Sequence, residues 1–202
     1  SPKRRWVVMP RDELANLDGE FRRSSGRHLF VPSSDRAPLV LAANHPVKGA
    51  PDHNPLARIV LKKSPPVQHQ VKATLADKVE LLGYDLRLPH RDSVGPGETF
   101  TVSWVFKALR SNLGKYKVFV HVDGEGRRLN GDPEAAGGEY PVHRWQAGDL
   151  IVDEQRLTIP ASYRPGTYTL YVGLFRGSVR MPVTKGPRET DNRISAGSLH
   201  VR

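Results

Sequence analysis

The sequence predicts a mainly β protein: an antiparallel, immunoglobulin-like or carbohydrate-binding-module-like β-sandwich of about eight strands, preceded by a small β-α-β-β unit. From residue 76 onward, apolar and polar residues alternate with a period of two, which is typical of half-buried strands. The 18 glycines and 17 prolines among 202 residues favour many turns over long helices. Pro65-Pro66 resists both helix and interior strand, so we expect two domains, residues 1–66 and 67–202.

The first domain is expected to begin with a short strand and a helix. Residues 6–9 are apolar and are followed by Pro10, which stops the strand. Asp12 is placed to cap a helix that begins near Glu13. Apolar residues then recur at spacings that give this helix one apolar face: Leu14, Leu17 and Phe21.

Three more strands are expected in the first domain, at residues 28–31, 39–42 and 57–61. No glycine-rich phosphate loop separates the first strand from the helix, so nucleotide binding has no support. The loop between the later strands holds His45 and His53, but no matching third metal ligand accompanies them. A turn with solvated histidines is the simpler interpretation.

The second domain contains a series of alternating segments. The clearest strands span residues 79–88, 100–106, 118–122 and 168–175, with shorter ones at 150–152, 157–159, 179–183 and 199–201. Trp104 lies on the apolar side of its strand, so we expect it in the core. This regular spacing of strands and turns predicts the sandwich.

The chain is basic, with a net charge of +10, and the excess is concentrated near its start. Residues 1–75 carry 13 Lys and Arg against 6 Asp and Glu. Such a surface favours nucleic acid, anionic lipid or acidic glycans, and a solvated face without a partner is the alternative. Nucleic acid is not expected, because the basic residues are scattered and do not interleave with aromatics. Lys3-Arg4-Arg5 would favour an anionic membrane surface.

Composition excludes several classes of protein. The absence of cysteine excludes disulfides, thiol catalysis and cysteine-ligated zinc. No apolar run approaches the roughly 20 residues that span a bilayer, and no apolar segment behind the basic start forms a signal peptide. Since the chain begins with Ser1, we expect any targeting signals to lie elsewhere in a longer protein.

Candidate binding residues gather between positions 121 and 153. His121 and Asp123 lie two apart on one strand, so both project from the face opposite Val120 and Val122, toward solvent or a groove. Aromatic rings bind the apolar faces of sugars, and neighbouring polar groups bind their hydroxyls. The predicted ligand-binding set is His121, Asp132, Tyr140, His143, Trp145 and Asp149.

Other interpretations of these residues stay open. Trp145 packs in the core if this sandwich buries a tryptophan there, and the acids then cap turns and strand ends. Asp132 with Asp149 or Asp153 would form an oxygen-rich calcium site, although the spacing is not that of an EF-hand. Apart from calcium, no cofactor is expected. Paired carboxylates would suit a glycoside hydrolase, but no signature fixes their separation.

Residues 79–202 also carry a series of short motifs in a recognisable order. These are Phe119-Val120-His121-Val122-Asp123, Tyr140-Pro141, Pro165-Gly166-Thr167-Tyr168 and Val172-Gly173-Leu174-Phe175. Together they resemble the β-sandwich domain at the C-terminal, non-cytoplasmic end of bacterial membrane glycosyltransferases of the dolichyl-phosphate-mannose type, which use lipid-linked phosphosugars. The layout is also similar to that of carbohydrate-binding modules.

This resemblance implies a non-catalytic accessory domain, because the catalytic acids of that family lie in a transmembrane bundle that this chain lacks. The domain would lie outside the cytoplasm, in the periplasm, as part of a membrane-anchored parent. It would bind a glycan or lipid-linked sugar, or position the acceptor. The alternatives are a structural or protein-interaction sandwich without a small ligand, indicated by a flat apolar patch, and a glycan-acting hydrolase, indicated by two carboxylates facing across a cleft.

Overall fold

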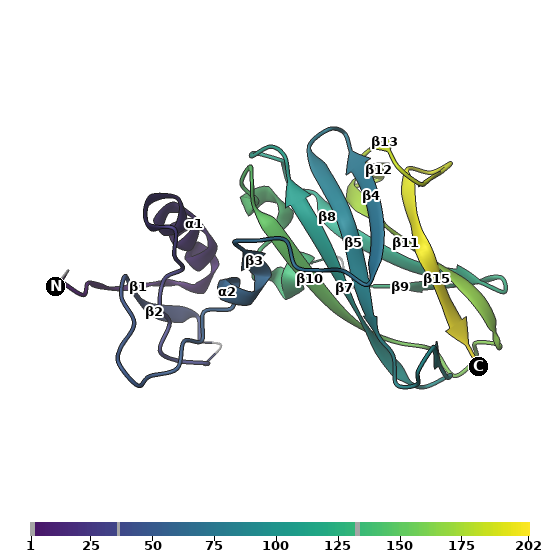
Figure 1. Ribbon diagram of the computed structural model, residues 1–202, viewed down its shortest axis with the longest axis horizontal. Coiled ribbons are helices and arrows are strands. Elements are labelled where there is room, and N and C mark those ends of the chain that lie inside the picture. The colour runs from purple at the N-terminus through teal and green to yellow at the C-terminus, as the bar shows by residue number, and fades with distance from the viewer. Residues whose placement is uncertain (1–2, 36, 132–133) are drawn as a thin grey trace. The chain divides into compact units, whose positions relative to one another are not determined.

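The computed structural model describes residues 3–35, 37–131 and 134–202. The protein is mainly β with antiparallel sheets, which confirms the predicted fold class (Figure 1). It divides into two compact units, Ser1–Val60 and Leu61–Arg202. Within the described ranges, none of the helices has the length and apolar character needed to cross a bilayer.

The first unit is built on a two-stranded antiparallel ribbon, whose strands are separated by a helix. Its elements are β1 (Trp6–Pro10), η1 (Arg11–Glu13), α1 (Leu14–Ser25), β2 (Leu39–Ala43), α2 (Leu56–Ile59) and β3 (Val60–Leu61), the last of which spans the division. Helix α1 ends at Gly26, which adopts a left-handed φ of 67° and donates its N–H to Arg22 O. Glycine takes this conformation without a steric penalty, so it is a favourable residue after a helix.

Three predicted details of the first unit are wrong. Residues 28–31 do not form a strand, since only Phe30 makes an isolated bridge, to Ala43. Side chains take the place of a strand partner here: Asp18 accepts the Leu29 N–H at 2.8 Å, and Asp52 accepts the Val31 N–H at 3.0 Å. Carboxylates that satisfy the backbone locally compete with sheet pairing.

The other two errors concern helix starts. Residues 57–59 belong to α2 rather than to a strand, because Pro55 and the Asn54 side chain, which accepts the Leu56 N–H at 2.9 Å, begin a helical turn. Asp12 makes no capping hydrogen bond to the helix. It lies inside the 3-10 turn η1, so its side chain is not at the capping position.

The second unit contains two sheets. One has the strand order β13-β4-β5-β7-β10-β3, and the other has the order β14-β15-β11-β8-β9, with β12 beside β11 and β6 beside β15. The strands are β4 (His69–Leu75), β5 (Val79–Arg87), β6 (Ser93–Val94), β7 (Thr99–Ala108), β8 (Lys117–Gly124), β9 (Arg127–Asn130), β10 (Leu150–Thr158), β11 (Gly166–Arg176), β12 (Val179–Arg180), β13 (Val183–Lys185), β14 (Arg188–Glu189) and β15 (Arg193–Val201). Two short helices, η2 (Ala135–Gly138) and η3 (Val142–Arg144), lie between β9 and β10.

The pairing of these strands is of the immunoglobulin type. Strand β7 pairs with β10 in one sheet, whereas β8, β11 and β15 are neighbours in the other. Near the start of β11, the Tyr168 hydroxyl donates a hydrogen bond to Arg164 O at 3.0 Å. This is the tyrosine corner that recurs in immunoglobulin-like sandwiches.

The core is filled by the alternating apolar positions of both sheets. Trp104 is fully buried, as predicted, and its ring lies 5.1 Å from that of Tyr84. Gly197 of the other sheet makes this packing possible, because a Cβ atom there would lie 2.0 Å from the Tyr84 hydroxyl. In β8 and β11, the residues that alternate with the core positions face outward. The candidate site lies on this outer face.

Candidate functional site

Phe119, His121 and Asp123 project from the outer face of β8, because the alternate residues Val118, Val120 and Val122 fill the core. His121 nevertheless retains only 9% of its exposed surface, and Phe119 is also buried. Other elements therefore cover this face and turn it into a groove, whereas the sequence left both solvent and a groove open for His121.

The covering elements border an open pocket of about 650 Å³, here called the outer-sheet pocket. Its walls come from β8, from β11 and β12 with the turn between them, and from the β14–β15 turn. The lining residues are Phe119, His121, Phe175, Gly177, Ser178, Arg180, Thr190, Asp191 and Asn192. The pocket thus combines aromatic rings with charged and neutral hydrogen-bonding groups.

A glycine in β11 sets the position of the aromatic floor. Gly173 pairs directly with Phe119, and a Cβ atom at this position would lie 2.6 Å from the Phe119 ring. Only glycine leaves room for the ring to lie across the neighbouring strand. Phe175 then meets the Phe119 ring edge to face, with centroids 6.3 Å apart.

An arginine joins the two turns at the rim. The Arg180 guanidinium lies 4.9 Å from the centroid of the Phe119 ring. It also donates a hydrogen bond to Asp191 O at 3.0 Å and lies 3.5 Å from the Asp191 carboxylate. A cation over an aromatic face is attracted by the ring quadrupole, so Arg180 is held from two sides.

His121 is electrostatically unusual. Burial, together with the charges of Arg128, Arg180 and Arg193, lowers the pKa of His121 to about 4, although Asp123 opposes this shift. The imidazole is therefore neutral near pH 7. Its Nδ1 is buried and has no hydrogen-bond partner within the described ranges. An unsatisfied buried polar atom costs free energy unless a ligand or water completes it.

A fixed ion-pair network lies beside the pocket. Asp123 accepts hydrogen bonds from Arg128 at 2.8 and 2.6 Å and from Arg193 at 2.6 Å. Burial would raise the pKa of Asp123, but these two arginines outweigh it and lower the pKa. Arg193 also lies 3.9 Å from the centroid of the Tyr171 ring. Asp123 therefore stays ionised and serves as an anchor for the arginines.

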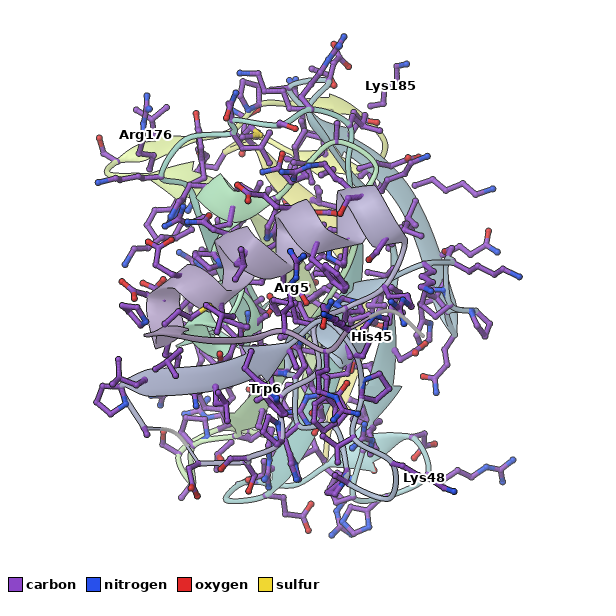
Figure 2. The ribbon with its side chains drawn as sticks, turned by 90° about the vertical axis from the view of Figure 1, so that its left-hand side faces the viewer. Arg5, Trp6, His45, Lys48, Arg176 and Lys185 are labelled. Carbon is purple, nitrogen blue, oxygen red and sulfur yellow. The ribbon has the colours of Figure 1, made fainter. Side chains whose placement is uncertain are left out.

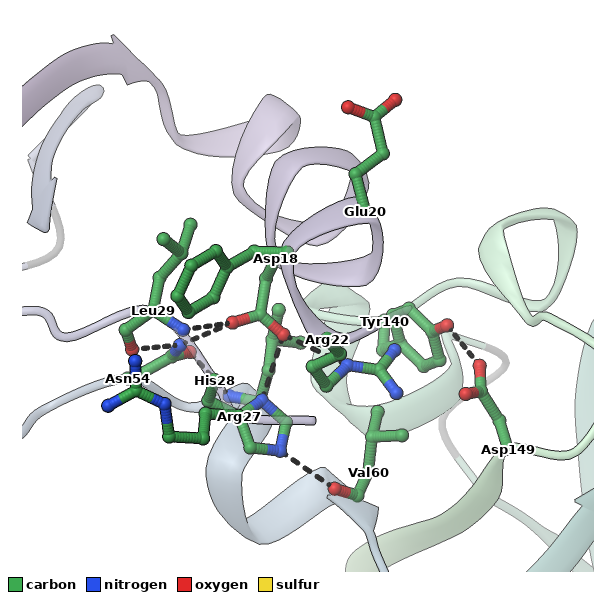
Figure 3. Close-up of polar contacts among 12 residues, drawn as sticks. Asp18, Glu20, Arg22, Arg27, His28, Leu29, Asn54, Val60, Tyr140 and Asp149 are labelled. Carbon is green, nitrogen blue, oxygen red and sulfur yellow. Dashed lines mark hydrogen bonds and ion pairs between the residues drawn. The ribbon is translucent and has the colours of Figure 1, made fainter. Parts of the chain in front are cut away.

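The predicted site residues do not assemble on one surface. His121 lines the outer-sheet pocket, whereas Tyr140, Trp145 and Asp149 are buried in the segment between β9 and β10. The Tyr140 hydroxyl donates to the Asp149 carboxylate at 2.5 Å (Figure 3), and Trp145 Nε1 donates to Tyr140 O at 3.0 Å. Because Trp145 is fully buried, its ring packs in the core and presents no face to solvent.

The remaining predicted residues lie elsewhere. His143 is exposed on η3, and Asp132 lies outside the described residues. Asp153 is fully buried and accepts the Ala136 N–H at 2.7 Å. Among residues 3–35, 37–131 and 134–202, no three acids or histidines lie close enough together to hold a metal ion. The calcium site that includes Asp132 stays a prediction.

Sequence reasoning missed most of the pocket. Phe175 lies on the same outer face as His121, and the alternation in β11 was a usable signal for it. Arg180 lies on β12, and Asp191 and Asn192 lie in the β14–β15 turn. Only the pairing of β12 with β11 and of β14 with β15 brings these residues to the pocket.

No protein-family model matches the chain, and neither does any curated protein.

Proposed function

We propose that this chain is a non-catalytic accessory domain that binds a glycan, or the sugar of a lipid-linked glycan, in the outer-sheet pocket. The observation that carries this proposal is the pairing of the Phe119–Phe175 floor with the polar rim of Arg180, Asp191 and Asn192. Following the resemblance in residues 79–202, the domain belongs to a bacterial membrane glycosyltransferase-like parent and works outside the cytoplasm, where it holds or positions the acceptor.

The chemistry of the pocket suits a sugar. A pyranose has an apolar C–H face, which stacks on aromatic rings, and a rim of hydroxyls that both donate and accept hydrogen bonds. Arg180 supplies donors and Asp191 supplies acceptors, while Thr190 and Asn192 supply both. A few polar groups around an apolar floor are typical of small-ligand sites.

Binding is favoured over hydrolysis because a glycosidase uses a pair of carboxyl groups, whereas the described residues that line the pocket include one, Asp191, with Asp123 beside the pocket. A glycosidase needs one carboxyl group that holds a proton for the leaving oxygen. Asp123 cannot supply it near neutral pH, because Arg128 and Arg193 lower its pKa. A purely structural role is favoured less, because this outer face forms a polar pocket rather than a flat apolar patch.

A glycan array followed by calorimetric titration tests the proposal. We expect Phe175→Ala and Arg180→Ala to weaken binding of the best glycan at least about tenfold, because each removes a contact worth about 1.4 kcal/mol or more. Arg87→Ala is the matched control, since Arg87 is exposed in the other sheet and pairs only with Glu154 among the contacts described. No binding to any glycan, or equal weakening by the control, would overturn the proposal.

The same titration with a calcium chelator distinguishes sugar binding in the outer-sheet pocket from sugar binding at the predicted calcium site. We expect the affinity to be unchanged, because the pocket offers a guanidinium, an imidazole and amides rather than a carboxylate cluster. A strict calcium requirement would instead place the site at Asp132, Asp149 and Asp153.

A further inference from the structure

One face of the β1–β2 ribbon in the first unit is apolar and exposed. Val8 pairs with Leu41, Pro10 pairs with Leu39, and Trp6 precedes them on the same side. Trp6 is 45% exposed, Val8 64%, Leu39 61% and Leu41 41%. Among the described residues, these four are all but one of the large hydrophobic side chains that are exposed, the other being Val179.

The opposite face of the same ribbon is already covered. Met9, Val40 and Ala42 are buried, so the ribbon contributes this face to the core of the first unit. A strand with one solvated face normally alternates apolar and polar residues. Here both faces are apolar, which indicates that the outer one meets a second apolar environment.

Basic residues flank the exposed face. The side chains of Lys3, Arg4 and Arg5 are exposed, and none of them pairs with an acid in the part of the chain that the structure describes. Arg4 donates to Pro46 O at 2.9 Å, and the Arg5 N–H donates to Asn44 at 2.8 Å, which ties this leader to the loop after β2. Figure 2 labels Arg5, Trp6 and the exposed Lys48 on the first unit.

We infer that the outer face of β1–β2 docks on the surface of an anionic lipid membrane, with Trp6, Val8, Leu39 and Leu41 in the interfacial layer and Lys3-Arg4-Arg5 on acidic headgroups. Tryptophan favours the boundary between headgroups and acyl chains. Apolar contact and attraction of basic residues to anionic lipid add together in surface-bound elements. This surface and its partner are independent of the glycan pocket.

Charge also favours a membrane over a second copy of the chain as the partner of this face. A symmetric dimer through this face would bring two Lys3-Arg4-Arg5 segments toward the same interface, where like charges repel. A negatively charged lipid surface instead neutralises them. The small, two-stranded face is also better matched to a planar partner than to a large specific protein interface.

Vesicle binding by the whole chain tests the inference. The vesicles contain phosphatidylcholine alone or phosphatidylcholine mixed with phosphatidylglycerol, and binding is measured by co-sedimentation and tryptophan emission. Trp104 and Trp145 are fully buried, so a blue shift on binding reports Trp6. We expect binding and a blue shift with the anionic vesicles, and weakening of both at high salt, because salt screens charge.

Three variants locate the surface. We expect the double variant Val8→Ser with Leu39→Ser to weaken partition into anionic vesicles at least about tenfold, since it removes exposed apolar area. We expect Lys3→Glu with Arg4→Glu to remove the preference for anionic vesicles. Val179→Ser is the matched control, because Val179 is 62% exposed but lies on β12 of the sandwich. The control should bind like the unaltered chain.

Several outcomes would overturn the inference. These are an unchanged Trp6 spectrum with anionic vesicles, equal binding by the Val8→Ser with Leu39→Ser variant, and equal loss in the control. A concentration-dependent dimer that this variant abolishes would assign the face to a second copy. Circular dichroism of each variant distinguishes lost binding from lost folding, and the glycan titration is read separately.

Discussion

At the scale of single residues, His121 shows how a tertiary environment changes a side chain. Its position on β8 follows from period-two alternation, but its neutral state follows from the rings and arginines around it. The centroid of the Phe119 ring lies 4.9 Å from that of the imidazole, and Arg128, Arg180 and Arg193 all disfavour a positive charge on the imidazole. A solvated histidine at the same sequence position would titrate near its ordinary value of 6.5.

We expect the stability of the sandwich to fall as the pH drops from about 6.5 to about 4, because the unfolded chain then binds a proton that folded His121 rejects. Protonation of His121 is disfavoured only in the folded state. Its pKa of about 4 therefore lowers the free energy of unfolding by up to about 3 kcal/mol below that pH, and leaves it unchanged above pH 6.5. Urea unfolding across this range measures it.

His121→Gln should reduce this pH dependence, because the proton-rejecting group is gone. His200→Gln, at an exposed strand position, should leave it unchanged. An identical slope in all three proteins would show that His121 is not the group responsible.

At the scale of elements, the segment between β9 and β10 holds two short helices, η2 and η3, and a buried polar cluster fixes its path. Asp149 accepts hydrogen bonds from the Tyr140 hydroxyl and from the Gln146 N–H at 2.9 Å. Trp145 closes the segment through its contact with Phe106, at a centroid distance of 5.5 Å. Tyr140, Trp145 and Asp149 are residue types that suit sugar recognition, but here they stabilise the connection between β9 and β10.

We expect Tyr140→Phe to lower the free energy of unfolding by about 1.5–3 kcal/mol, because it removes a charge-assisted hydrogen bond to a buried carboxylate. Thermal or urea unfolding measures the change. Tyr163→Phe is the matched control: the Tyr163 hydroxyl is buried without a partner in the described ranges, so its removal should cost little or stabilise. Unchanged stability of Tyr140→Phe would contradict this role.

At the scale of the whole molecule, each of the two units has a core of its own. The first unit depends on Asp18, a fully buried carboxylate on α1 (Figure 3). Asp18 accepts hydrogen bonds from Leu29 N at 2.8 Å and Asn54 Nδ2 at 2.9 Å, and it lies 2.8 Å from His28 Nδ1. One side chain thus ties the helix to two loops.

We expect Asp18→Ala to destabilise the first unit by about 3–5 kcal/mol, because its buried partners lose their acceptor. Hydrogen exchange followed by mass spectrometry should show lost protection in β1, α1 and β2, with β7 and β11 unchanged. Glu20→Ala, at an exposed position of the same helix, is the control and should have no effect on exchange. Lost protection in both units would mean that they unfold together.

The fold class followed from the sequence because it depends on local patterns. Period-two alternation around Trp104 and Tyr168 identifies strands whatever their partners are, and Pro-Gly turns limit their length. The prediction of a strand at residues 28–31 was wrong for the opposite reason. Its backbone N–H groups bond to the carboxylates of Asp18 and Asp52, which lie 11 and 21 positions away and which no local pattern records.

The sequence by itself determined the sandwich, the buried strand faces and the basic leader, since each arises from neighbouring residues on one element. Only the tertiary structure decided which polar residues face a common pocket. Strand pairing carries Arg180 and Asp191 over Phe119 and His121, and it buries Tyr140, Trp145 and Asp149 elsewhere. The physical reason is that burial and pKa depend on atoms brought close by folding, and sequence separation does not measure that distance.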